Sequence, residues 1–182
     1  MRCGRNFCLW AVLFIVLVAG CAAPKGGLPG ASARGDAEGV NSLIARGADV
    51  NETGEYGLTA LMLAARGGRS DIVMKLISSG ADVNAQSNAG LTALMFAVRA
   101  GHSDAVLKLL TAAADVNAQS KSGLTALMLA TVGGRTAMVQ ILIAAGADVN
   151  ARDRNGMTAL MWGEKKGRKK AVKMLKDAGA EE

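Results

Sequence analysis

A unit that recurs every 33 residues constrains this chain more than any other feature. The unit opens on a glycine, at Gly57, Gly90, Gly123 and Gly156. It closes on GADVN at 47–51, 80–84 and 146–150, and on AADVN at 113–117. A period in this range is typical of stacked-repeat solenoids, in which each unit buries its apolar surface against its neighbours.

Each unit is predicted to form two short helices separated by a turn. A threonine precedes an apolar run in every copy, where its hydroxyl can accept hydrogen bonds from the first free N–H groups of a helix: Thr59, Thr92, Thr125 and Thr158. Glycines such as Gly68 and Gly101 then interrupt the run, because glycine adopts positive φ at no steric cost. Apolar residues return at helical spacing, as at Ile72, Val73 and Leu76. The fold class predicted is an all-α solenoid of helix-turn-helix units.

These residues together resemble the ankyrin repeat, in its glycine positions, its threonine cap and its ADVN turn. Three departures stand out. Alanine replaces the proline that follows the cap in the family, and Met62, Met95, Met128 and Met161 replace its histidine. Ala113 occupies a position that is glycine in the other copies, and we expect it to strain that turn. The resemblance implies a protein–protein interaction module without enzymatic activity.

The repeat predicts where the domain divides. The ankyrin-like domain is expected at 31–182, with a degenerate N-terminal cap at 31–53, full units at 54–86, 87–119 and 120–152, and a C-terminal cap at 153–182. Residues 21–30, rich in proline and glycine, are expected to be the lipidated cysteine and a flexible tether, and Leu28–Arg34 is expected to be a poor first helix because it contains Pro29 and Gly30.

The N-terminal segment reads as a secretory leader. Arg2 and Arg5 precede the apolar run 7–18, which is too short for a transmembrane helix of about 20 residues. The sequence VAGC at 18–21 resembles the lipobox of bacterial lipoproteins, which implies cleavage after residue 20 and lipidation of Cys21. Ala22 in second place implies the outer membrane, facing the periplasm. An ordinary cleaved leader with a chance cysteine remains the alternative.

Neither a catalytic site nor a cofactor is expected. His102 is the single histidine, and its Gly-His setting favours a structural role. Cys3 and Cys8 lie in the leader, so Cys21 alone remains after cleavage and no thiol metal site can form. The recurring aspartates, Asp49, Asp82, Asp115 and Asp148, belong to turns. The recurring methionines favour core packing, with a redox or Cu(I)-handling role as the alternative.

In ankyrin repeats the turn tips and the exposed side of the first helix form a concave face that binds partners. Carried over to this chain, the partner-binding residues are Glu55, Tyr56, Leu58, Arg66, Asn88, Leu91, Arg99, Lys121, Ser122, Leu124, Val132, Arg154, Asn155, Met157, Lys165 and Lys166. They differ between copies while the scaffold does not, and they include the only tyrosine. An apolar strip with a basic flank suits a protein partner with an acidic rim.

The last copy carries a dense basic run: Lys165, Lys166, Arg168, Lys169, Lys170, Lys173 and Lys176. A solubilising cap face is one interpretation. The other is a docking patch for an acidic partner or a tether to anionic envelope polymers. Nucleic acid is disfavoured, because no aromatic residues are interleaved for base stacking and the leader directs the chain out of the cell.

Overall fold

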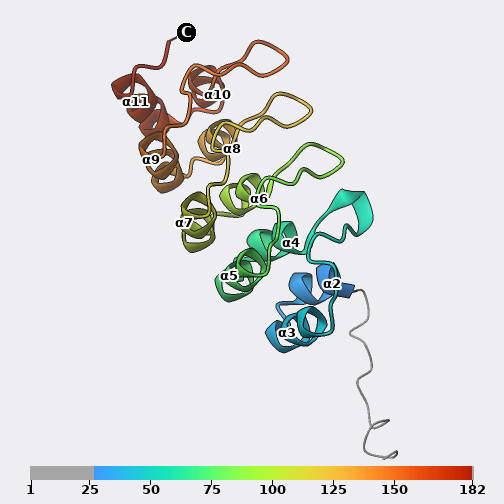
Figure 1. The fold of residues 1–182 in the computed structure, drawn as a ribbon. Helices are drawn as coiled ribbons and strands as arrows, with labels where there is room; N and C mark the ends of the chain where they lie inside the picture. The colour runs from blue at the N-terminus through green and yellow to red at the C-terminus, as the bar shows by residue number, and fades with distance from the viewer. Residues whose placement is uncertain (1–26, 182) are drawn as a thin grey trace, which may run out of the picture.

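The structure, a computed structural model, describes residues 27–181 as one stack of five helix pairs (Figure 1). The first helices of the pairs are α2 (Gly27–Arg34), α4 (Ala60–Arg66), α6 (Ala93–Ala100), α8 (Ala126–Val132) and α10 (Ala159–Lys165). The second helices are α3 (Ala37–Ala45), α5 (Ser70–Ser78), α7 (Ser103–Thr111), α9 (Thr136–Ala144) and α11 (Lys169–Asp177). Hairpin-like loops project from the side of the first helices, and the first of them contains the 3₁₀ turn η1 (Glu55–Gly57). The predicted all-α solenoid is confirmed.

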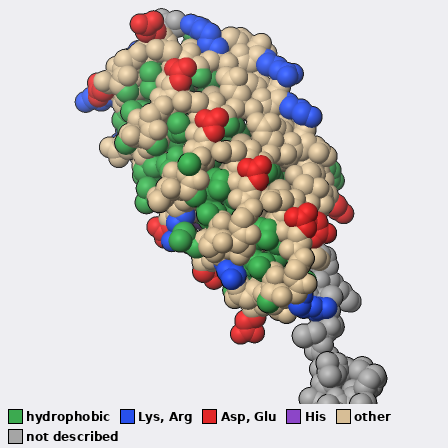
Figure 2. Space-filling view, in the orientation of Figure 1, with side chains coloured by type: hydrophobic (Ala, Val, Ile, Leu, Met, Phe, Trp, Pro, Cys, Tyr) green, Lys and Arg blue, Asp and Glu red, His purple; other side chains and the backbone are tan. Residues whose placement is uncertain are grey.

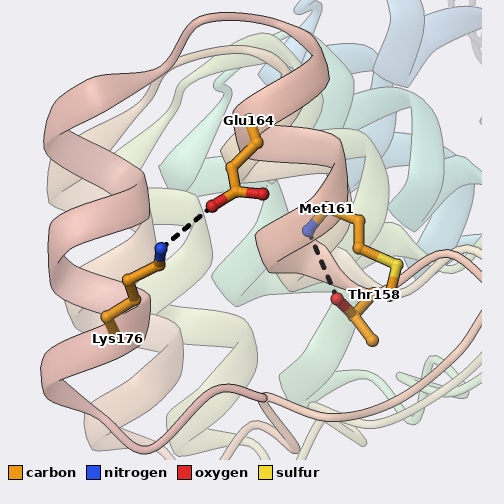
Figure 3. A network of polar contacts seen from close by, with 4 residues as sticks. All are labelled: Thr158, Met161, Glu164 and Lys176. Carbon is orange, nitrogen blue, oxygen red and sulfur yellow. Dashed lines mark hydrogen bonds and ion pairs between the residues drawn. The ribbon is translucent and has the colours of Figure 1, made fainter. Parts of the chain in front are cut away.

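The threonines cap the first helices as the sequence predicts. The Thr59 hydroxyl accepts a hydrogen bond from the Met62 N–H at 3.3 Å, and the same bond recurs at Thr92, Thr125 and Thr158. Figure 3 shows this cap in the last repeat, where the Thr158 hydroxyl faces the Met161 nitrogen. The same view shows α10 linked to α11 by an ion pair of 3.0 Å between Glu164 and Lys176. Both of these charged side chains are exposed, so the pair contributes at most about 1 kcal/mol.

The core is a continuous column between the two layers of helices. Each first helix packs against the first helix of the next repeat and against its own second helix. Met62, Met95 and Met128 are each 1% exposed, which supports the packing interpretation of the recurring methionines. Met161 is only half-buried, because α10 belongs to the last repeat and has a neighbour on one side only. Figure 2 shows that apolar side chains also reach the surface, in a band along the stack beside regularly spaced acidic side chains.

The asparagine of each GADVN turn joins its repeat to the next. The Asn51 carboxamide oxygen accepts a hydrogen bond from the Asp82 N–H at 2.7 Å, and its nitrogen donates to the Gly80 carbonyl at 3.2 Å. Asn84, Asn117 and Asn150 make the same two bonds to the repeat that follows each of them. These bonds supply polar cohesion between neighbouring repeats.

Ala113 has the strained backbone that the sequence predicts. Its φ is +60°, in the left-handed region, where the equivalent Gly80 has φ +89° and Gly146 has φ +85°. For a residue with a Cβ this conformation costs about 1–2 kcal/mol.

The prediction of a flexible tether at 21–30 is wrong for residues 27–30, which are helical, so the repeats begin before residue 31. Helix α2 begins at Gly27, and Leu28 is fully buried against the stack. Pro29 fits because it lies in the first turn of α2, where a helix needs no N–H donor. Leu28 and Ala31 then supply the apolar face that packs on α4, which makes α2 a regular helix of the first repeat.

The signal peptide expected at 1–20 and the lipidation expected at Cys21 lie outside the described residues. Between residues 27 and 181, no helix is both long and apolar enough to cross a bilayer.

Candidate protein-binding surface

The loops between repeats form a continuous ribbon along one side of the stack. The Asn88 N–H donates to the Tyr56 carbonyl at 2.9 Å, which ties the second loop tip to the first. The Lys121 N–H donates to the Ala89 carbonyl at 3.0 Å, and the Arg154 N–H donates to the Ser122 carbonyl at 3.1 Å. Because every tip is tied to the next, side chains on different tips are held in fixed relative positions. We call these tips, together with the exposed side of the first helices, the hairpin face.

The structure exposes most of the residues predicted to bind a partner. Exposed are Glu55, Tyr56, Arg66, Asn88, Arg99, Lys121, Ser122, Arg154, Asn155, Lys165 and Lys166. Half-buried are Leu58, Leu91, Leu124, Val132 and Met157. The polar and aromatic members are therefore available to a partner, and the aliphatic members only in part.

The repeated apolar residue after each opening glycine has a structural role. Leu91 packs against the core, and its carbonyl accepts from the Ser87 N–H at 3.0 Å to close the loop. Leu124 and Met157 make the same closing contact with Ser120 and Asp153. The recurrence of these residues therefore follows from loop architecture, so it does not by itself indicate binding.

Tyr56 stands apart from the equivalent residues of the other tips. Its φ is +60° and its side chain is 75% exposed, whereas Ala89, Ser122 and Asn155 have ordinary negative φ. The strained segment lies in η1, within a loop that an antiparallel bridge between Thr53 and Thr59 closes. Strain at an exposed aromatic residue is a feature that clusters at functional surfaces.

Sequence reasoning missed a row of buried and half-buried side chains on the first helices. Equivalent positions of the first helices hold Leu63, Phe96, Leu129 and Trp162. The Arg99 guanidinium lies 5.8 Å from the centre of the Phe96 ring, and the Lys165 ammonium lies 5.1 Å from the Trp162 ring. The sequence could have revealed this row, because its four positions are spaced by the same 33 residues as the opening glycines. The row places aromatic rings beneath the cations that the sequence did identify.

The buried carboxylate of Asp153 holds the last loop in place through hydrogen bonds. It accepts them from the Met157 N–H at 3.0 Å, the Trp162 indole N–H at 3.0 Å and the Asn155 N–H at 2.8 Å. Burial by itself would raise the pKa of Asp153, but these three donors and the charge of Lys165 together hold that pKa below its ordinary value of 3.8. Asp153 therefore stays ionised near neutral pH and anchors Trp162 on the hairpin face.

His102 has the structural place that the sequence predicts. It immediately precedes α7, and its ring packs over Gly68 of the preceding repeat, where a Cβ would lie 2.6 Å from the imidazole Nδ1. Within the described part of the chain, no group of three or more His, Cys, Asp or Glu side chains could hold a metal ion.

A solenoid of stacked repeats that presents a ribbon of tied loops belongs to the class of repeat scaffolds that bind other macromolecules. A family model for ankyrin repeats, in three copies, matches residues 28–120 and again residues 106–182. The chain belongs to the ankyrin repeat family, whose repeats are typically non-catalytic protein-binding modules. No curated protein matches the chain.

Proposed function

We propose that this protein binds a protein partner through the hairpin face, by recognition without chemistry, at the bacterial cell envelope. The observation that carries the proposal is a uniform scaffold with variable exposed tips. The first tip residue is Glu55, Asn88, Lys121 or Arg154 in successive repeats, while the capping threonines and ladder asparagines stay the same. A constant scaffold whose exposed residues differ from repeat to repeat is suited to recognition of one specific partner.

The charges of the hairpin face indicate the chemistry of the partner. Glu55 lies on the first tip, while Arg99, Lys121, Arg154 and Lys165 lie further along. Of the two rings beneath these cations, Phe96 is only 6% exposed and belongs to the core, whereas Trp162 is half-buried and offers part of its ring as the aromatic contact area that interface cores favour. The partner that fits is a protein with an apolar strip flanked by carboxylates.

The N-terminal sequence supports an envelope location. A basic start, a short apolar run and VAGC at 18–21 favour lipidation of Cys21 after removal of the leader. Ala22 favours retention at the outer membrane, with the repeats in the periplasm. Such a protein would act as a scaffold, as a stress-protective adaptor or as an immunity protein against a toxin.

The test is affinity capture from envelope extract with residues 22–182 as bait, which keeps α2 intact. The binding-deficient variant is Tyr56→Ala/Arg99→Ala/Lys121→Ala, which changes three exposed side chains. We expect a protein that the parent retains and this variant loses. The matched control is Met74→Ser/Leu107→Ser, because these residues are 47% and 49% exposed and line a hollow of about 500 Å³ between α5 and α7, on second helices.

The control makes the outcome decisive. A partner lost from the Met74/Leu107 variant, but kept by the Tyr56/Arg99/Lys121 variant, would move the binding site to the groove between α5 and α7. If the parent retains no protein at all, the proposal of a protein-binding adaptor is wrong.

A further inference from the structure

The last repeat carries a concentration of positive charge, of which the hairpin face includes only Lys165 and Lys166. Seven Lys and Arg residues lie between positions 165 and 176, and the structure exposes every one of them. Glu164, which pairs with Lys176, and Asp177 are the acidic residues beside them. A solubilising cap requires polar residues of either sign, so an excess of one sign indicates more than solubility.

The cations lie on a surface that no other repeat covers. On α11 the buried residues Ala171 and Leu175 face the stack, while Lys169, Lys170 and Lys173 are exposed. Figure 1 shows α11 at one end of the stack and α2 at the other, so the basic surface is far from the point where the chain enters the fold.

This surface includes a basic hollow. The hollow has a volume of about 400 Å³ and is lined by Gly134, Thr136, Gly167, Arg168, Lys169, Lys170 and Ala171, none of them acidic. The corresponding hollow at the N-terminal ends of α5 and α7, of about 300 Å³, is lined by Gly68, Ser70, Gly101, His102, Ser103 and Asp104. The same fold position thus changes from mixed polarity to strongly cationic.

The composition of the surface selects the kind of ligand. Every exposed residue of α11 is charged, so the surface has no apolar centre from which to build a protein–protein interface. Six of the seven cations are lysines, which act as hydrated point charges, whereas bidentate recognition of one defined anion favours arginine. A cluster of four to eight cations on an amphipathic helix matches the pattern that binds anionic lipid head groups.

We propose that the basic surface of the last repeat, formed by Arg168, Lys169, Lys170, Lys173 and Lys176, binds the phosphate-bearing surface of an anionic lipid bilayer. The contact is electrostatic, because the apolar residues of α11 are engaged in the stack and do not insert. It does not depend on lipidation of Cys21, which lies before the other end of the stack.

The test is vesicle flotation with the full chain carrying Cys21→Ser, so that acylation cannot contribute and the leader is the same in all variants. Neutral phosphatidylcholine vesicles are compared with vesicles containing about one third phosphatidylglycerol. At low salt we expect partitioning at least about tenfold stronger onto the anionic vesicles, since several lysines near such a surface are attracted to it together. High salt should remove this gain, because surface charges are screened.

Two variants that each lose three positive charges, at different places in the stack, show whether binding depends on α11. Lys169→Gln/Lys170→Gln/Lys173→Gln should lose the gain on anionic vesicles, while Arg46→Gln/Lys75→Gln/Lys108→Gln, with its changes in other repeats, should keep most of it. Circular dichroism checks that both variants are folded. The proposal is overturned if the parent shows no preference for anionic vesicles, or if both variants lose it equally. It is also overturned if short duplex DNA binds the parent more tightly than the vesicles do.

Discussion

At the scale of single residues, two non-glycine residues between positions 27 and 181 have a left-handed backbone conformation that favours glycine, Tyr56 and Ala113. The two cases differ in kind. Ala113 occupies a turn position where other repeats have glycine, and it is not one of the residues of the proposed binding surface. Tyr56 lies on a loop tip and presents an exposed ring, so its strain coincides with the proposed site. A substitution that relieves the backbone strain should therefore leave partner binding unchanged at Ala113 but not at Tyr56.

Ala113→Gly should stabilise the protein. Glycine accepts φ +60° without steric penalty, but it also makes the unfolded chain more flexible, which favours unfolding. Because the relieved strain is the larger of these two effects, we expect the free energy of unfolding to rise by about 1 kcal/mol. Urea unfolding followed by circular dichroism measures the change. The matched control is Ala112→Gly in the same turn, where φ is −86° and glycine should destabilise the fold. A lower unfolding midpoint for Ala113→Gly than for the parent would contradict the strain assigned to this position.

Asp153→Asn should weaken the last repeat in a pH-dependent way. Because the folded-state pKa of Asp153 is lowered, its carboxylate stabilises the fold above the ordinary value of 3.8, and this contribution disappears as pH falls through the lower folded-state pKa. We expect the variant to lose about 1–3 kcal/mol at neutral pH, the range for hydrogen bonds to a charged group. Unfolding curves from pH 3 to 7 test this. The gap between parent and variant should shrink only on the acidic side, and a gap independent of pH would exclude an ionised carboxylate as the cause.

At the scale of elements, cohesion comes from contacts that cross from one repeat to the next. The asparagine ladder runs along the base of the loops, and the bonds between loop tips run along their outer edge. Each hairpin is thus held at its base and at its tip. The arrangement gives a rigid recognition surface even though no loop contains a long strand.

Asn84→Ala removes one rung of this ladder. The Asn84 carboxamide accepts from the Asp115 N–H at 2.8 Å and donates to the Ala113 carbonyl at 3.4 Å. Since the side chain is exposed and water can replace part of the loss, we expect the free energy of unfolding to fall by about 1–2 kcal/mol. Thermal or urea unfolding provides the measurement. Asn41→Ala, an exposed asparagine on α3, is the control and should change stability by less than about 0.5 kcal/mol.

Features within one repeat were enough to predict the helix pairs, whereas contacts between residues far apart in the sequence were not predicted. The threonine caps, the glycine turns and the strain at Ala113 depend on residues within one repeat, so the sequence revealed them. Helix α2 was predicted only as a poor helix, because Pro29 and Gly30 favour a turn and the sequence does not show that α4 supplies a surface for Leu28 to pack against. On the candidate site, the exposed tips were foreseen, but the ring of Trp162 beneath Lys165 depends on the buried partner Asp153.

At the scale of the whole molecule, the stack has two chemically different ends. The chain enters the described structure at Gly27, six residues after Cys21, and the basic surface lies at the far end. With lipidation of Cys21 and binding of α11 to an anionic bilayer, both ends would contact a membrane. The hairpin face would then be held beside that membrane along its whole length.

Cys21→Ser tests the anchor. We expect the variant to move from the membrane fraction to the soluble fraction at high salt, because stable attachment requires acyl chains. Cell fractionation with immunoblotting measures this, and circular dichroism of the purified variant should match that of the parent. If the variant still sediments with membranes at high salt, lipidation of Cys21 is not the anchor.

The asparagine ladder is directional, since every rung reaches forward to the glycine and aspartate positions of the following unit and none reaches back. Asn150 finishes the series on Gly179 and Glu181, so even the final residues of the stack complete a junction of the same kind. All the joints are therefore interchangeable. A duplicated block of 33 residues could be spliced in at any of them with its bonding already satisfied, so the binding ribbon can lengthen in evolution, or in the laboratory, by whole increments.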